Sequence, residues 1–152
     1  AQHVAFRVKA EENEVPKRVV NSFKEQYRNV TGVCWMIISS TSLEKDFGIR
    51  KTGDEERSTF YDVTFSATDG RREVVYDHFG HNVGVKKQIN TTSLPTAVMN
   101  TVNRAKEKAQ ILSAKAVTEG APQPSCYEVV IADEGVEKSI IVRSSGELME
   151  TN

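Results

Sequence analysis

Two histidines flank a turn near the middle of the chain and are its clearest candidates for metal chemistry. His78 and His81 lie close to Asp77, and Asp69 or Glu73 could supply a further ligand. A metal site requires several ligands that converge on one point, so two histidines without a fixed third ligand are weak evidence for one. A solvent-exposed turn is the favoured interpretation. A structural or metal-binding protein that uses His78 and His81 is kept as the alternative.

Nucleophilic catalysis has little support in the sequence. The motifs Gly-x-Ser-x-Gly and His-Glu-x-x-His are absent, as are glycine-rich phosphate loops. Cys34 and Cys126 lack Cys-x-x-Cys and zinc spacing, and each lies in a strand-like run. Two buried free thiols are favoured, with a disulfide in an oxidising compartment as the alternative. The sequence therefore predicts a protein that is not an enzyme, and we assign it no catalytic residue, no metal and no cofactor.

Composition limits the kinds of partner that the chain can bind. Its 152 residues carry a net charge of −1 at pH 7, which creates no long-range field to attract nucleic acid or an anionic membrane. No apolar run approaches the roughly 20 residues of a membrane-spanning helix. We therefore expect neither a nucleic-acid partner nor membrane insertion.

An internal similarity organises the chain. The segment from Val15 to Phe23 recurs as Leu94 to Val102, and the segment from Tyr61 to Phe65 recurs as Tyr127 to Ile131. A similarity of this length is typical of one supersecondary unit that is used twice. It predicts an α+β fold with two tandem repeats, each of one helix followed by an antiparallel β-meander, with the helices packed on one face of the sheets.

Hydrophobic periodicity predicts the elements of each repeat. Residues 15–30 carry apolar side chains at helical spacing, and Pro16 marks the start of the helix. A second helix carries Leu94, Val98 and Val102 on its inner face. Strands are expected at residues 3–9, 33–39, 60–68, 72–78, 83–89, 111–117, 126–132 and 138–143. The predicted core residues are Val19, Phe23, Trp35, Val63, Phe65, Val98, Val102, Tyr127 and Val129.

The predicted domains are residues 1–90 and residues 91–152. The first contains an additional N-terminal strand and a charged insertion at residues 41–59, which is broken by Gly48 and Gly53. The charges and glycines of this insertion favour an extended, solvated hairpin or loop.

The order of these features resembles a known family. A Val-Pro helix start, an amphipathic helix, Val33-x-Trp35, Tyr61-x-Val-x-Phe65 and Tyr76-Asp-x-x-Gly80 are similar to the PepSY-like, β-lactamase-inhibitor-like domain of bacterial secreted proteins. The second repeat departs from this pattern, since Ala114 stands where Trp35 would be. The resemblance implies a periplasmic or secreted protein whose signal peptide has been removed. It also implies a non-catalytic protein that binds another protein and could inhibit an envelope enzyme.

A surplus of apolar residues on one strand indicates where a partner could bind. If Trp35 faces the helix, then Met36 and Ile38 face the other side of the sheet, where polar residues are the norm. Covering by another part of the chain is the favoured explanation, and a protein-binding patch is the alternative. For that patch we name Met36, Ile38 and Phe60, with Phe47 from the insertion, and we expect residues 41–59 to determine specificity.

Overall fold

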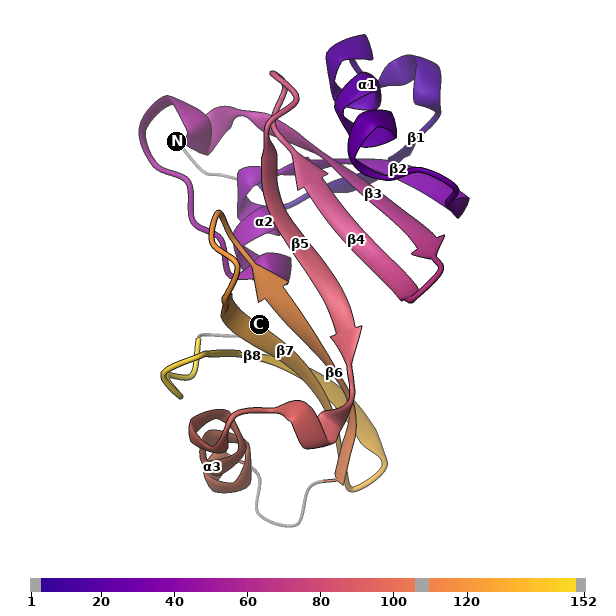
Figure 1. The fold of residues 1–152 in the computed structure, drawn as a ribbon. Coiled ribbons are helices and arrows are strands. Elements are labelled where there is room, and N and C mark those ends of the chain that lie inside the picture. The colour runs from indigo at the N-terminus through magenta and orange to yellow at the C-terminus, as the bar shows by residue number, and fades with distance from the viewer. Residues whose placement is uncertain (1–3, 106–109, 150–152) are drawn as a thin grey trace. The chain divides into compact units, whose positions relative to one another are not determined.

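The computed structural model describes residues 4–105 and 110–149, which form two compact units, Ala1–Val85 and Lys86–Asn152 (Figure 1). The strands are β1 (Arg7–Ala10), β2 (Thr31–Ser39), β3 (Thr59–Ala67), β4 (Gly70–Tyr76), β5 (Asn82–Ile89), β6 (Gln110–Thr118), β7 (Pro124–Asp133) and β8 (Val136–Arg143). The helices are α1 (Lys17–Gln26), α2 (Ser40–Phe47) and α3 (Thr96–Ala105), with short 3-10 turns η1 (Glu12–Glu14), η2 (Gly53–Arg57) and η3 (Thr91–Ser93). Within the described ranges, no helix is long and apolar enough to cross a membrane.

The strands form one sheet in chain order, from β1 to β8. The pairs β1–β2, β2–β3, β3–β4, β6–β7 and β7–β8 are antiparallel. The prediction of two tandem repeats, each with its own meander, is therefore wrong, although the α+β class and the approximate strand positions agree with the structure. Hydrophobic periodicity is a local property of each strand. It does not reveal whether the last strand of the first repeat, β5, also pairs with the first strand of the second repeat, β6.

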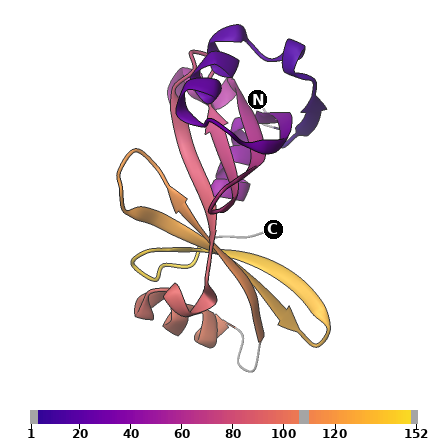
Figure 2. The same ribbon diagram turned by 45° about the vertical axis from the view of Figure 1, so that its right-hand side comes forward.

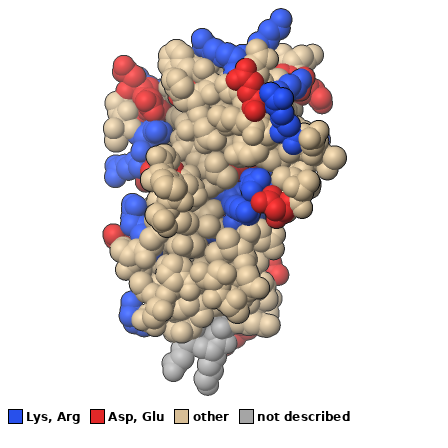
Figure 3. Space-filling model, in the orientation of Figure 1, with Lys and Arg blue, Asp and Glu red and all other residues tan. Residues whose placement is uncertain are grey.

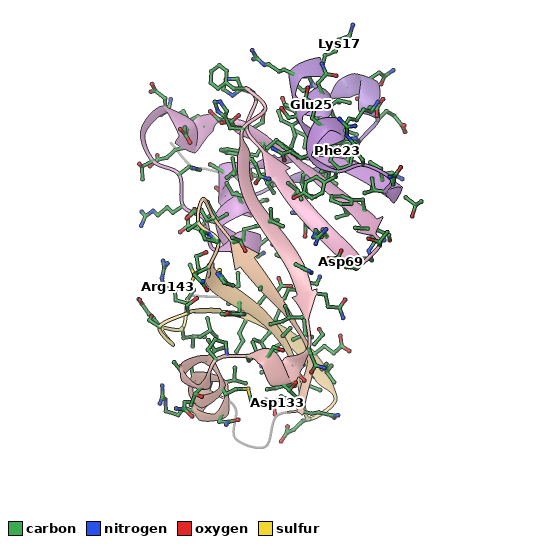
Figure 4. All side chains as sticks on the ribbon, viewed as in Figure 1. Lys17, Phe23, Glu25, Asp69, Asp133 and Arg143 are labelled. Atoms are coloured by element: carbon green, nitrogen blue, oxygen red, sulfur yellow. The ribbon has the colours of Figure 1, made fainter. Side chains whose placement is uncertain are left out.

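The core of the first unit lies between α1 and the strands that it covers (Figure 2). Phe23 points from α1 toward the sheet, whereas Lys17 and Glu25 point away from it (Figure 4). The Phe23 ring meets Trp35 edge-on at a centroid distance of 5.4 Å and Phe65 at 5.1 Å. The predicted core residues of this unit are confirmed as buried. The helix ends at Gln26, before the predicted limit, and Pro16 lies directly in front of its first residue.

The second unit has a separate core beneath α3. Val98 and Val102 of the helix pack with Ala114 of β6, Tyr127 and Val129 of β7, and the inner residues of β8. All four predicted core residues of this unit are confirmed as buried.

The insertion is the largest departure from the predicted secondary structure. It forms α2 and η2, so the prediction of a solvated hairpin at residues 41–59 is wrong. Ser39 caps α2 by accepting a hydrogen bond from the Ser42 amide at 3.1 Å, and Gly48 ends it in the left-handed conformation at φ 66°. α2 packs against β2 and β3. Its Asp46 reaches residues on the face opposite α1, so the prediction that the helices share one face is also wrong.

Candidate functional site

The structure leaves little of the sequence-predicted binding face accessible. Ile38, Phe47 and Phe60 are almost completely buried, and Met36 is half-buried, with its sulfur 3.7 Å from the Arg7 guanidinium. Leu43 of α2 is buried as fully as these residues. The insertion, which was expected to stand beside a binding patch, instead packs on the strands, and this supports the favoured explanation that another part of the chain covers this face.

A network of charges crosses this covered face and was not foreseen. Arg7 of β1 donates to Asp46 of α2 at 2.7 Å, to Glu73 of β4 at 3.1 Å and to Asp62 of β3 at 3.3 Å. The side chain of Asp62 is fully buried, and its Oδ1 lacks a hydrogen-bond partner. Burial, followed by the neighbouring Glu73 carboxyl, raises the pKa of Asp62 to about 9, and these effects outweigh the opposing effect of Arg7. This network ties β1 and α2 to the sheet.

The two histidines that were considered for metal binding have other contacts. His81 Nδ1 lies 3.1 Å from Asp77 Oδ2, and the His78 ring contacts the Phe79 ring in a tilted arrangement at a centroid distance of 4.0 Å. No group of three or more His, Cys, Asp or Glu side chains that could hold a metal ion occurs in the parts of the chain that the structure describes. The metal-binding alternative therefore gains no support from the geometry.

Both cysteines are free thiols. Cys34 is exposed, so the prediction that both are buried is wrong for this residue, whereas Cys126 is buried. Burial raises the pKa of the Cys126 thiol, which disfavours the reactive thiolate.

The turn between β4 and β5, residues 77–81, is held rigidly by one carboxylate. Asp77 Oδ1 accepts hydrogen bonds from the backbone amides of Phe79 and His81, both at 2.9 Å. The Asp77 amide in turn donates to the His81 carbonyl at 3.0 Å. We call residues 77–81 the aromatic turn, since three of its five residues carry aromatic rings.

The aromatic turn is also fixed to α1. Gly80 has a φ of +90°, and a Cβ atom there would lie 2.8 Å from the Arg18 carbonyl oxygen and 2.7 Å from Ser22 Oγ. Arg18 Nε donates to the His78 carbonyl. Gly146 approaches α3 of the second unit in a similar way, since a Cβ atom there would lie 3.0 Å from the Ala97 carbonyl oxygen. Only glycine allows a turn to approach a helix backbone this closely.

Gly80→Ala should therefore destabilise the first unit by more than backbone strain alone. Gly135 provides a matched control, because its φ is +80° but nothing lies within 4 Å of a Cβ placed there. We expect Gly135→Ala to cost about 1–2 kcal/mol of unfolding free energy and Gly80→Ala to cost clearly more. Urea denaturation of both variants measures this difference, and equal costs would show that the turn is not packed on α1.

The aromatic turn presents an exposed apolar ring. Phe79 is 56% exposed although the surrounding turn is fixed. The Arg18 guanidinium lies 5.1 Å from the centre of its ring, and the His81 ring lies 6.0 Å away on the same turn. The ring thus contacts Arg18, His78 and His81 while more than half of its surface remains in water. Sequence reasoning located the turn but assigned it to solvent, and the aromatic residue at its tip was the available signal.

Comparison with known proteins reveals the fold but no family assignment. No family model matches the chain, and no curated protein matches it. Its fold is similar to the folds of two proteins with crystal structures. One is a protein from Bacteroides eggerthii that is provisionally described as periplasmic, and the other is a DUF2874 family protein from Bacteroides uniformis. The first has 16% identity, a TM-score of 0.61 and coverage of 90% of this chain and 86% of that one. The second has 18% identity, a TM-score of 0.60 and coverage of 90% and 87%.

A BLIP-like (β-lactamase-inhibitor-like) protein from Bacteroides fragilis is similar as well. It has 14% identity, a TM-score of 0.56 and coverage of 91% of this chain and 85% of that one. The β-lactamase-inhibitor-like part of the predicted resemblance is thus supported at the level of fold, and the PepSY-like part has no matching family model. This chain has the fold of Bacteroides proteins that carry periplasmic, BLIP-like and DUF2874 descriptions.

Proposed function

We propose that this chain is a non-catalytic, exported protein that binds another protein through the aromatic turn. The single observation that carries the proposal is Phe79, an exposed ring on a turn that is fixed before any partner arrives. The partner would offer an apolar pocket for the ring. An acidic group at the edge of that pocket would face Arg18, which lies beside the ring.

Rigidity is what makes this turn suitable for recognition. Binding energy is lost when loops and side chains must become ordered, and a turn that is already ordered avoids much of this cost. The residues that dominate protein interfaces are often aromatic anchors that enter a pocket on the partner. Asp77 orders the backbone on one side of Phe79, and the approach of Gly80 to α1 orders the other.

Two observations support export and a protein partner. The periplasmic description of one similar structure is consistent with a periplasmic or secreted location. On the face that Figure 3 shows, positive and negative side chains are interspersed without a broad area of one sign. Such a surface lacks the basic area typical of nucleic-acid binding.

Phe79→Ala should weaken partner binding by about 30-fold, which corresponds to about 2 kcal/mol for an interface anchor. Val136→Ala is the matched control, because Val136 is 55% exposed and lies in the second unit. Partners are recovered quantitatively from the envelope fraction of the producing organism with the parent and with each variant. Loss of a discrete partner with Phe79→Ala alone supports the proposal. Equal recovery with all three proteins, or no partner with the parent, contradicts it.

An enzyme assay tests whether the proposed binding inhibits an enzyme. One similar structure is BLIP-like, so we propose that the partner is an envelope enzyme whose active site receives the aromatic turn. A class A β-lactamase can be titrated with the parent protein and with Phe79→Ala while hydrolysis of a chromogenic cephalosporin is followed. Inhibition by the parent alone supports this form, and no inhibition by the parent excludes this class of enzyme as the target.

A further inference from the structure

β1 is an open edge of the sheet. It stands at one end of the strand order, and no described residue pairs with its outer side. The opposite edge strand, β8, is partly covered, because the Arg143 amide donates to the Glu147 carbonyl and the Met149 amide donates to the Ile141 carbonyl. Open edges are sites for pairing with another strand, and proteins usually protect them.

The backbone of the first unit shows which groups are available at this edge. The Phe6 amide donates to Ser39 Oγ at 3.0 Å, and the Phe6 carbonyl accepts from the Ser39 amide at 3.1 Å. Phe6 thus directs both of its backbone groups to β2. Because successive residues of a strand direct their backbone amide and carbonyl groups to opposite sides, Arg7 directs both groups away from β2, toward the open edge.

The side chains at this edge form an apolar row that is exposed to solvent. Val4, Phe6 and Val8 occupy alternate positions and are 69%, 37% and 55% exposed. A pocket of about 280 Å³, lined in part by Val4 and Phe6, adjoins the row. Charged side chains often protect edge strands. The charge of Arg7, however, lies on the other face, where it is bound to Asp46, Asp62 and Glu73.

We propose that β1 pairs with β1 of a second copy of this chain, antiparallel, about a two-fold axis that passes through Phe6. The apolar pattern Val4-Ala5-Phe6-Arg7-Val8 is symmetric about Phe6, so an interface of this kind is self-complementary. The two Phe6 rings oppose each other, and Val4 opposes Val8 of the second copy on both sides. The amide and carbonyl of Arg7 form hydrogen bonds with the carbonyl and amide of Ala5 in the second copy. This pairing extends β1 from Arg7 back to Val4.

Charge disfavours the registers that are centred beyond Phe6. An axis through Arg7 would place the two Arg7 side chains opposite each other, and an axis through Val8 would place Arg7 opposite Lys9 of the second copy. Like charges that lie directly opposite each other on paired strands are destabilising. An axis through Ala5 would leave Val8 opposite Gln2, whereas the register centred on Phe6 gives all three apolar residues an apolar partner and places each arginine opposite an alanine.

The dimer should be weak and dependent on concentration. The paired segment is about five residues long in each copy, and interfaces of this size bury less surface than stable complexes require. The proposal does not depend on the aromatic turn, which belongs to a different part of the first unit. Failure of one proposal therefore leaves the other intact.

Cysteine cross-linking tests the register. Opposed residues at positions without backbone hydrogen bonds lie about 4.5 Å apart between Cα atoms, which is within disulfide range. Val4→Cys and Val8→Cys are made in the Cys34→Ser background, which removes the exposed native thiol. A mixture of the two variants should form a disulfide-linked heterodimer on mild oxidation, and each variant alone should not. Efficient cross-linking of Val8→Cys alone, or none in the mixture, would overturn the proposed register.

Sedimentation velocity tests the dimer itself. The sedimentation coefficient of the parent should rise with concentration up to about 1 mM, which covers weak association. Val8→Lys should remain monomeric, and Val136→Lys, at the same exposure of 55%, should behave as the parent does. Thermal melting confirms that both variants are folded. A parent that is monomeric throughout, or equal effects of the two lysines, would overturn the proposal.

Discussion

Phe23→Ala should lower the free energy of unfolding by about 3–5 kcal/mol, the range for large-to-small changes in a core. Phe23 is only 3% exposed and has aromatic neighbours on three sides, namely Trp35, Phe65 and Tyr27. Removing the ring leaves a cavity that α1 is hindered from closing, because Arg18 of the helix donates a hydrogen bond to the His78 carbonyl of the aromatic turn.

Lys24→Ala is the control for this prediction. The Lys24 side chain is 60% exposed, and it forms a surface ion pair with Glu12 at 3.5 Å. Its replacement should change the stability by less than about 0.5 kcal/mol. Urea denaturation of the two variants gives the comparison. Similar losses for Phe23→Ala and Lys24→Ala would show that α1 does not bury the face described here.

Asp62→Asn should stabilise the protein, and the gain should grow with pH. Burial and Glu73 hold the pKa of Asp62 at about 9 in the folded state, against about 3.9 in an unfolded chain. Between these values the folded protein retains a proton that the unfolded chain has released, so raising the pH favours unfolding. This carboxyl therefore costs up to about 1.4 kcal/mol per pH unit in this window.

Asparagine removes the titration and keeps both the shape of the side chain and a donor for Glu73. Thermal melting of the parent and of Asp62→Asn from pH 5 to pH 9 should show two curves that diverge as the pH rises. Asp54→Asn, at an exposed residue of η2, is the control and should follow the parent. A destabilised Asp62→Asn at pH 8 would mean that Asp62 is ionised and serves as a counter-ion for Arg7.

The strands and the two cores could be predicted because their signals are local. Alternation of apolar residues places Val63 and Phe65 on one face of β3 without knowledge of its neighbours. Helix α2 was missed because Glu44, Lys45 and Asp46 dominate its composition. Its signals were the Ser39 cap, the spacing of Leu43 and Phe47, and the terminal Gly48.

The charge network could not be predicted, since it depends on several elements at once. Alternation places Asp62 on the face away from α1, but only the tertiary structure brings Arg7, Glu73 and Asp46 to it from β1, β4 and α2. The exposure of Phe79 is also a tertiary property. The sequence locates the turn, and the packing of Gly80 on α1 determines that the ring points into solvent.

Site-specific photo-cross-linking at position 79 reports directly whether a partner contacts the aromatic turn. A photoreactive phenylalanine analogue replaces Phe79 in one protein and Val136, which is equally exposed, in another. Both proteins are irradiated in cells of the producing organism. We expect one discrete adduct with an envelope protein from position 79 and none from position 136. Equal labelling from both positions, or no adduct from position 79, would contradict it.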